Sequence, residues 1–267
     1  MSAPTKRLRI AVLTQEDPFY IPRNVHLLCS EPGLDVREIV VLDARGSVAN
    51  MRSRLLRWFG PVAVARMAAR AGGQAAMEAL NRASGYRLPL APTSLRAVAR
   101  RHGIPFSVET DANAPALVER LAAHDLDALV SFSAPQVFRA PLLQVPRLGC
   151  VNLHCSLLPR YRGLLPSFWV LFHGEPVSGA TVHLMDTEID NGGILKQAEV
   201  NIQGMRTMHE VLTATKRRGG ELMVEALREL AAGTSQLLPN PADAGSYHTW
   251  PTDDDARAFR ARGYGLA

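Results

Sequence analysis

The sequence predicts an α/β fold with an open, doubly wound, mostly parallel sheet. Three observations support this: short Val-, Ile- and Leu-rich runs that suit strands buried on both faces, helical patterns between these runs, and a regular alternation of the two. Such alternation favours right-handed crossover units, which build a sheet of this kind. At 267 residues the chain is long enough for a core well above marginal size.

The first half of the chain provides the candidate strands and helices of this sheet. The strands are expected at 9–13, 36–42, 105–108, 126–132 and 148–153. The helices are expected at 20–30, 48–59, 61–83, 92–102 and 113–124. No GxGxxG or Walker sequence follows the first strand, so the sheet is Rossmann-like without a nucleotide fingerprint there.

The second half continues with a loop rich in Pro and Gly and then regular elements. These are a helix at 165–173, strands at 180–185 and 194–202, and a long amphipathic helix at 207–231. After Gly233 the sequence is loop-like until Pro251, Thr252 and Asp253, which begin a short terminal helix. We therefore divide the chain into a domain over 1–232 and a short C-terminal extension over 233–267.

Composition and targeting signals indicate a cytoplasmic globular protein. The hydrophobic content of 47% and the charged content of 21% are ordinary for a globular chain. No apolar run approaches the roughly 20 residues that span a bilayer. The N-terminal residues lack the apolar stretch and cleavage site of a secretory signal.

The three cysteines, Cys29, Cys150 and Cys155, form neither a CxxC pair nor a disulfide framework. No Cys or His cluster has metal-ligand spacing, so we expect no metal. His154 and Cys155 are adjacent, but adjacent strand residues point to opposite faces. We therefore interpret Cys155 as a small buried residue and not as a thiol nucleophile.

Two segments carry the candidate chemistry: VNLHCSLLPRYRG at 151–163 and DTEIDNGG at 186–193. Asn152 and His154 share one face of a strand end, where ligands bind in open α/β sheets. Asp190 lies in a glycine-bounded loop. Singly, each residue is more often a cap, a packed histidine or a turn former. Together, an amide, an imidazole and a carboxylate can run acyl transfer without a covalent enzyme intermediate.

With SLLPRYRG and the DxxxDxGGIL pattern, these segments closely resemble the signature of the N10-formyltetrahydrofolate-dependent formyltransferases. That family includes the methionyl-tRNA, glycinamide-ribonucleotide and sugar-nucleotide formyltransferases. The match covers about 45 residues in the order that the family requires. The resemblance implies that 1–232 is a formyltransferase catalytic domain that uses N10-formyltetrahydrofolate as co-substrate and transfers its formyl group to a primary amine.

The resemblance also implies residue roles. Asn152 would point an N–H at the developing oxyanion, and His154 would donate to the same oxygen and help move protons. Asp190 would orient the imidazole and accept the proton shed by the amine. Backbone would form the folate pocket at Phe132, Ser133, Ala134, Pro135, Gln136, Val137, Thr187, Glu188 and Ile189. The sequence SFSAPQVF departs from the family's usual Tyr-Gly start, which leaves the loop boundaries open.

The acceptor amine is inferred by comparing subfamilies. TQEDPFYIPRN lacks the glycine turn of the glycinamide-ribonucleotide enzymes, which counts against that substrate. The methionyl-tRNA enzymes generally carry a C-terminal barrel domain, for which 233–267 is too short, so no nucleic-acid partner is expected. An amino-sugar nucleotide is the leading acceptor. An amino acid or another natural-product amine is the alternative, with methionyl-tRNA less favoured, and formyltetrahydrofolate hydrolysis is an alternative of a different class.

The segment 44–104 contains eleven arginines, no lysine and a single acid, Glu78, although the whole chain carries only +5. We favour an insertion of helices that pack on the core and expose arginines to water, because charge runs are usually solvated. An electropositive wall for a phosphorylated or nucleotide-linked substrate is a second interpretation. Contact with an anionic membrane surface is a third. The same apolar residues could form a homodimer interface.

For three further polar residues in or near the motifs, the sequence allows both a functional and a purely structural interpretation. Arg160 and Arg162 could contact an anionic substrate or face solvent, and for Arg160 we favour solvent. His183, on the strand before the Asp190 loop, is more readily a packed strand residue than a support for the site, because half of a strand's residues point inward.

Overall fold

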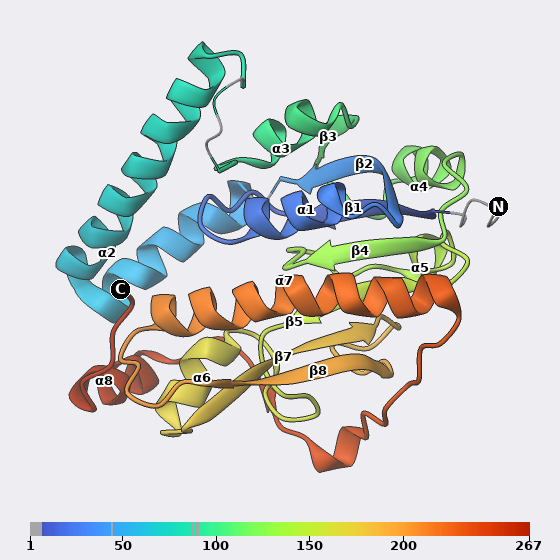
Figure 1. The fold of residues 1–267 in the computed structure, drawn as a ribbon. Helices are drawn as coiled ribbons and strands as arrows, with labels where there is room; N and C mark the ends of the chain where they lie inside the picture. Colours follow the sequence, from blue (N-terminus) through green and yellow to red (C-terminus); the bar gives the residue numbers. More distant parts are fainter. Residues whose placement is uncertain (1–6, 44, 87, 89–90) are drawn as a thin grey trace.

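The computed structural model of the chain describes residues 7–43, 45–86, 88 and 91–267, with backbone alone for 45–52. Its central sheet has seven strands in the order β3-β2-β1-β4-β5-β7-β8 (Figure 1). The parallel strands are β1 (Leu8–Thr14), β2 (Leu34–Leu42), β3 (Phe106–Glu109), β4 (Ala128–Phe132) and β5 (Cys150–His154). The antiparallel strands are β7 (Val177–Leu184) and β8 (Ile194–Asn201). The predicted doubly wound, mostly parallel sheet is confirmed.

Helices cover both faces of this sheet because each places a row of Leu, Val and Ile against it. One face carries α1 (Ile21–Ser30), α3 (Leu95–His102) and α7 (Met208–Ala232). The other carries α4 (Pro115–Ala122) and the four-residue α5 (Ala140–Leu143), which the sequence did not predict. Figure 1 shows α7 lying across the sheet along most of its length. Both faces of the sheet are therefore covered by helices.

Two consecutive glycines let α7 lie close to the sheet. A Cβ on Gly219 would meet Leu153 at 2.6 Å, and one on Gly220 would meet Asn24 Oδ1 at 2.2 Å. The helix begins at a capping box between Thr207 and Glu210 and ends at Gly233, whose φ is 68°. Because Gly219 and Gly220 have no side chain, the middle turns of α7 lie directly against β5 and α1.

The arginine-rich segment forms one long element, α2 (Arg45–Ala83), which breaks at Gly60 with φ 76° just before Pro61. The break lies where the sequence separates the helices predicted at 48–59 and 61–83. Trp58 and Phe59 are buried, and Trp58 Nε1 donates to Asp253 Oδ1 at 3.0 Å. After the break the helix extends away from the sheet (Figure 1) and exposes its arginines: Arg66, Arg70 and Arg82. Positions 44, 87, 89 and 90 of the segment lie outside the described residues.

The C-terminal extension packs back on the rest of the chain. Its α8 (Asp253–Ala261) joins α2 and α6 (Pro166–Phe172) in a third hydrophobic cluster. The remaining elements are β6 (Arg162–Gly163), β9 (Tyr247–His248) and a 3₁₀ turn, η1 (Ala242–Ala244). β6 and β9 pair in parallel, which the sequence did not predict. The division into 1–232 and 233–267 stays a prediction, and the extension contacts the motif segment directly.

Within the described part of the chain, no helix is both long enough and apolar enough to cross a bilayer.

Candidate functional site

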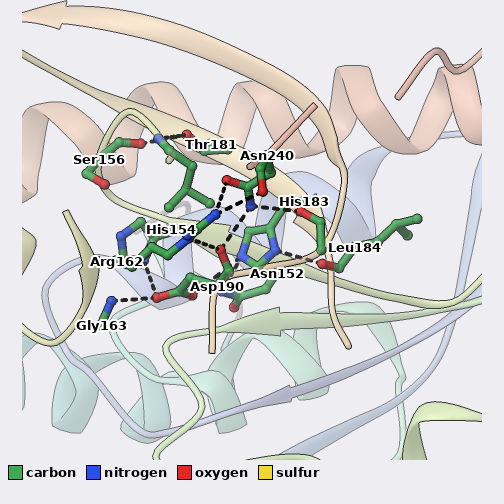
Figure 2. A network of polar contacts seen from close by, with 12 residues as sticks. Asn152, His154, Ser156, Arg162, Gly163, Thr181, His183, Leu184, Asp190 and Asn240 are labelled. Carbon is green, nitrogen blue, oxygen red and sulfur yellow. Dashed lines mark hydrogen bonds and ion pairs between the residues drawn. The ribbon is translucent and has the colours of Figure 1, made fainter. Parts of the chain in front are cut away.

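Asn152 and His154 lie on one face at the carboxyl end of β5, as their spacing predicts (Figure 2). β5 pairs with β4 on one side and with β7 on the other, so Asn152 stands beside Ser131 and His183. Asn152 is half-buried, and His154 is 7% exposed. The end of β5 therefore presents both side chains from a rigid strand and not from a loop.

Asp190 reaches the same place from the loop between β7 and β8. Its backbone is in the left-handed region, with φ 52°. Its Oδ2 lies 3.4 Å from His154 Nδ1 and accepts a hydrogen bond from Gly163 N at 2.9 Å. Its Oδ1 lies 3.6 Å from His183 Nε2. The structure thus brings the three predicted catalytic residues together and adds His183 and Gly163 to them.

The surroundings of Asp190 keep it ionised. Burial by itself would raise the pKa of this carboxyl. The neighbouring imidazoles of His154 and His183, with the N–H of Gly163, outweigh burial and hold the pKa of Asp190 well below its usual value. At neutral pH the site therefore contains a buried carboxylate.

The orientation of the His154 ring follows from its two partners. Nε2 donates to the carbonyl oxygen of Tyr161 at 2.8 Å, which leaves Nδ1 facing the Asp190 carboxylate. The Ser156 hydroxyl donates to the carbonyl oxygen of Arg160 at 3.0 Å and supports the same turn. The loop after β5 therefore sets the ring plane, and any proton on Nδ1 points at Asp190.

Asn152 is oriented by His183, which the sequence interpretation favoured as a mere packing residue. His183 is 2% exposed, so it does pack, but it also contacts the site. Its Nδ1 donates to Leu184 O at 2.7 Å, and its Nε2 lies 3.2 Å from Asn152 Nδ2. This Nε2 accepts from the Asn152 amide when the ring is neutral and faces Asp190 Oδ1 with a proton when the ring is charged. With the ring neutral, one amide N–H of Asn152 is directed at His183, which leaves the second N–H for another acceptor. The contact between His183 and Asn152 follows from the direct pairing of β5 with β7, so a prediction of that pairing would have revealed it.

Arg162 does not face solvent, contrary to one of the two expectations for it. It is 6% exposed and donates to Asp190 O, Asn240 O, Asn240 Oδ1 and Ala242 O at 3.1, 2.9, 2.8 and 3.2 Å. Asn240 Nδ2 in turn donates to Asp190 O at 2.9 Å. Arg162 and the extension thus hold the Asp190 loop by its backbone. Nothing in the sequence pairs these positions.

The residues expected to bind folate occupy two segments. Ala134 of the first segment and Met185, two residues before the second, pack against the same cluster of core side chains, so both segments approach one part of the core. The side chain of Phe132 is 2% exposed, so only its backbone could meet a ligand. The larger exposed apolar side chains are Val137, 56% exposed, and Ile189, 46% exposed. Ser133 and Ala134 are half-buried, and the remaining residues of the two segments are Pro135, Gln136, Thr187 and Glu188.

Gln136 fixes the predicted folate loop to its neighbour. Its Oε1 accepts from Ala112 N and its Nε2 donates to Thr110 O, both at 2.8 Å. Val137 O accepts from Asn113 Nδ2 at 3.0 Å. Backbone groups in a tethered loop, beside exposed apolar side chains, suit a flat ligand with polar edges such as a pterin.

Lys216 is a buried residue near this loop that the sequence interpretation did not single out. Its side chain is 9% exposed, and its ammonium donates to Ser133 Oγ at 2.9 Å. Asp17 Oδ2 lies 3.8 Å from the same nitrogen. Lysine is rarely buried without a specific partner, so this position needs an explanation of its own.

Cys155 is not suited to act as a nucleophile. It is 6% exposed, and burial raises the pKa of its thiol. Burial likewise raises the pKa of Cys150 and of Cys29, each to about 12. All three thiols are therefore protonated at neutral pH, whereas the thiolate is the reactive form.

Replacing Cys155 by serine is expected to leave turnover within about threefold of wild type, because no step needs a thiolate. Steady-state kinetics of Cys155→Ser beside Cys150→Ser would check this. Complete loss of turnover in the Cys155 variant, with an unchanged melting temperature, would restore the thiol mechanism.

Across the residues that the structure describes, no group of three or more His, Cys, Asp or Glu side chains is placed to hold a metal ion.

Known proteins share part of this sequence. A family model described as formyl transferase matches residues 80–227. A methionyl-tRNA formyltransferase from a Synechococcus strain is 38% identical over 167 residues, which are 61% of this chain and 50% of that protein. One from Chromohalobacter salexigens is 34% identical, over 62% of this chain and 51% of that protein. The chain thus spans about half the length of these curated relatives.

Solved structures share the fold at lower identity. Glycinamide ribonucleotide transformylase 1 from Symbiobacterium toebii superposes with a TM-score of 0.59 at 22% identity, covering 85% of this chain and 89% of that one. A sugar N-formyltransferase from a Shewanella species gives a TM-score of 0.59 at 17% identity, covering 97% and 89%. At these identities the likeness concerns the fold alone.

Proposed function

The chain belongs to the formyl transferase family, and we propose from this that it transfers the formyl group of N10-formyltetrahydrofolate to a primary amine. The observation that carries the proposal is the convergence of Asn152, His154 and Asp190 at the end of β5. These residues supply a hydrogen-bond donor, an imidazole and a carboxylate in one buried place.

In the proposed reaction the substrate amine attacks the formyl carbon and forms the new C–N bond. The carbonyl oxygen becomes an oxyanion, which the free N–H of Asn152 stabilises. The amine sheds one proton to Asp190, directly or through water, and His154 holds the carboxylate in place. Collapse of the intermediate breaks the bond to folate N10, which takes up a proton, so that tetrahydrofolate and the formamide leave.

Both ring nitrogens of His154 are engaged in the absence of substrate, with Tyr161 O and with Asp190. A direct bond from His154 to the oxyanion would require one of these contacts to open. We therefore assign the first oxyanion donor to Asn152, with His154 as proton carrier next to Asp190. The roles remain those of a proposal that variants of each residue can test.

We propose that the two loop segments at 132–137 and 187–189 bind the folate. Support comes from the packing of Ala134 and Met185 against one core cluster and from the exposed Val137 and Ile189, which can cover a flat ring. Backbone N–H and C=O groups at these positions would read the polar edge of the pterin.

For the acceptor we propose an amino-sugar nucleotide, with an amino acid or another natural-product amine as the alternative. The glycine turn is missing after β1, where Glu16, Asp17, Phe19 and Tyr20 stand instead, and this counts against glycinamide ribonucleotide as the acceptor. The exclusion of tRNA has no support from the comparisons, because the curated relatives are described as methionyl-tRNA formyltransferases. Methionyl-tRNA therefore belongs among the candidates. A homodimer and membrane-surface contact through 44–104 stay predictions.

The test is a screen of acceptors with N10-formyltetrahydrofolate, following the folate product by absorbance and the formylated product by mass. The acceptors are amino-sugar nucleotides, free amino acids and methionyl-tRNA. Formylation of a nucleotide-linked sugar would support both parts of the proposal. Formylation of another amine would keep the reaction and replace the acceptor.

A reaction without any amine serves as the control for hydrolysis. Release of formate at the same rate with and without acceptor, and no formylated product, would contradict transfer and favour a formyltetrahydrofolate hydrolase. The buried, hydrogen-bonded Asp190 is compatible with either, because it could activate a water molecule as well as an amine.

A further inference from the structure

The predicted folate loop begins at a residue held in an unfavourable backbone conformation. Ser133 directly follows β4 and has φ 53°, in the left-handed region. For residues other than glycine this region is costly unless a specific contact stabilises it. In the sheet, Phe132 pairs with Leu153, the residue before His154, so the chain leaves β4 beside the end of β5. The conformation of Ser133 therefore sets the direction in which the loop leaves the catalytic end of the sheet.

Lys216 supplies the contact at this residue. Its Nζ donates to Ser133 Oγ at 2.9 Å from the middle of α7. The same nitrogen lies 3.8 Å from Asp17 Oδ2 and 5.5 Å from the ring centre of Tyr20. Asp17 itself is fixed, because its Oδ1 accepts from Phe19 N and Tyr20 N at 2.7 and 3.1 Å. The ammonium is thus held between a carboxylate and a ring, and Ser133 accepts its hydrogen bond.

The location of this contact is where ligands bind in sheets of this type. The strand order places β1 and β4 side by side, with β2 and β3 beyond one and β5 beyond the other. The order reverses between β1 and β4, and ligands enter the crevice beyond such a reversal. Asp17 follows β1 and Ser133 follows β4, so Lys216 joins the two sides of that crevice. The close approach of α7 that brings Lys216 there depends on Gly219 and Gly220.

We propose that Lys216 is a positioning residue that holds Ser133 in the left-handed conformation and so keeps the loop at 132–137 ready to bind the folate. The proposal rests on the proposed function, because it assigns the loop to folate. Lys216 acts through Ser133 and touches no reacting atom. The simpler alternative is that Lys216 only forms a structural ion pair with Asp17. In that case its bond to Ser133 would not affect the loop.

The test uses a set of variants in the full chain. Lys216→Met and Ser133→Ala each remove the bond and keep the backbone penalty, so each is expected to weaken tetrahydrofolate binding roughly 5- to 30-fold. The double variant of Lys216→Met and Ser133→Ala should bind tetrahydrofolate no more weakly than either single variant. Glycine adopts the left-handed region without cost. Ser133→Gly should therefore bind like wild type, and adding Lys216→Met to it should change binding less than about twofold.

Hydrogen exchange of the ligand-free proteins gives a readout that needs no folate. Amides at 132–138 should exchange faster in Lys216→Met and return to the wild-type rate in the double variant with Ser133→Gly. Lys196→Met is the matched control, because Lys196 pairs with Glu229 at 2.7 Å at the surface of α7 and should change neither measurement.

The outcomes separate the inference from the proposed function. An unchanged exchange rate at 132–138 in Lys216→Met would overturn the role of Lys216, whatever the ligand. The role is also overturned if Lys216→Met weakens tetrahydrofolate binding equally in wild type and in Ser133→Gly. Lys216 would then act independently of Ser133. If wild type fails to bind tetrahydrofolate while exchange responds as expected, the folate assignment fails and the positioning role stands.

Discussion

Replacing Asp190 by asparagine is expected to lower turnover roughly 100- to 10,000-fold while leaving the fold and folate binding intact. Asparagine keeps an oxygen for the N–H of Gly163 and tolerates the left-handed backbone that Asp190 adopts. What it cannot do is accept the proton of the attacking amine. Single-turnover kinetics at saturating substrates, beside equilibrium binding of tetrahydrofolate, would measure the two effects separately.

Asp186→Asn is the matched control for this experiment. Asp186 belongs to the same loop, but it accepts from Glu188 N at 2.8 Å and from Asn191 Nδ2 at 3.3 Å, and it contacts none of the three catalytic residues. Its replacement is expected to change turnover by less than about threefold, because asparagine keeps an acceptor oxygen for Glu188 N at this half-buried turn. Near-normal turnover in Asp190→Asn would remove this carboxylate from the mechanism.

The same variant carries a pH prediction. The pKa of Asp190 is depressed in the folded protein, whereas a free Asp side chain titrates near pH ~3.9. Its contribution to stability is therefore present above about pH 4 and is lost as the pH falls below that value. Wild type should be more stable than Asp190→Asn at pH 7, and the gap in melting temperature should narrow below pH ~4. A gap that is constant down to pH ~2.5 would contradict the depressed pKa.

Arg162→Met is expected to lower the free energy of unfolding by about 2–4 kcal/mol and to reduce turnover as well. Methionine preserves the buried stem, but the carbonyl oxygens of Asp190, Asn240 and Ala242 lose their charged donor. For a chain of this size the loss corresponds to a fall in melting temperature of roughly 4–16 °C. The Asp190 loop should also exchange its amides faster, because Arg162 holds it by its backbone.

Arg160→Met provides the comparison within the same RYR sequence. Arg160 is 54% exposed in its side chain, where it pairs with Glu175 and covers the Tyr161 ring at 5.3 Å. Surface pairs of this kind contribute less than about 1 kcal/mol. Equal destabilisation by the two substitutions would show that the buried hydrogen bonds of Arg162 do not hold the loop.

The central site was predictable because its residues follow local rules. The period of two in a strand puts Asn152 and His154 on one face, and the buried apolar runs predict the parallel strands whose carboxyl ends carry them. The role of Asp190 could be predicted only from the second motif, because no local rule connects this turn residue with His154, 36 positions earlier. The helix break at Gly60 was also predictable, because a Gly-Pro pair interrupts a helical pattern.

The supporting residues were not predictable, because each depends on a contact that sequence periodicity does not encode. His183 meets Asn152 through antiparallel pairing of β5 with β7, and the alternation of strands and helices gave no register for that pair. Lys216 lies on a helix whose pattern predicts only which residues face the sheet. Arg162 illustrates the limit most clearly, because an arginine beside an exposed arginine gives no sign that it is buried.

The contacts of Arg162 and Tyr161 with the extension also determine when the site can form during synthesis. Arg162 bonds to Asn240 and Ala242, 78 and 80 positions later, and Tyr161 N donates to Ser246 Oγ, 85 positions later. At about 5–20 residues per second, a ribosome needs roughly 4–17 s to cover that distance. A nascent chain can pair β1, β2, β4 and β5 before these partners emerge. The Asp190 loop gains its anchor only afterwards, so the sheet can exist in the cell for seconds before the site is complete.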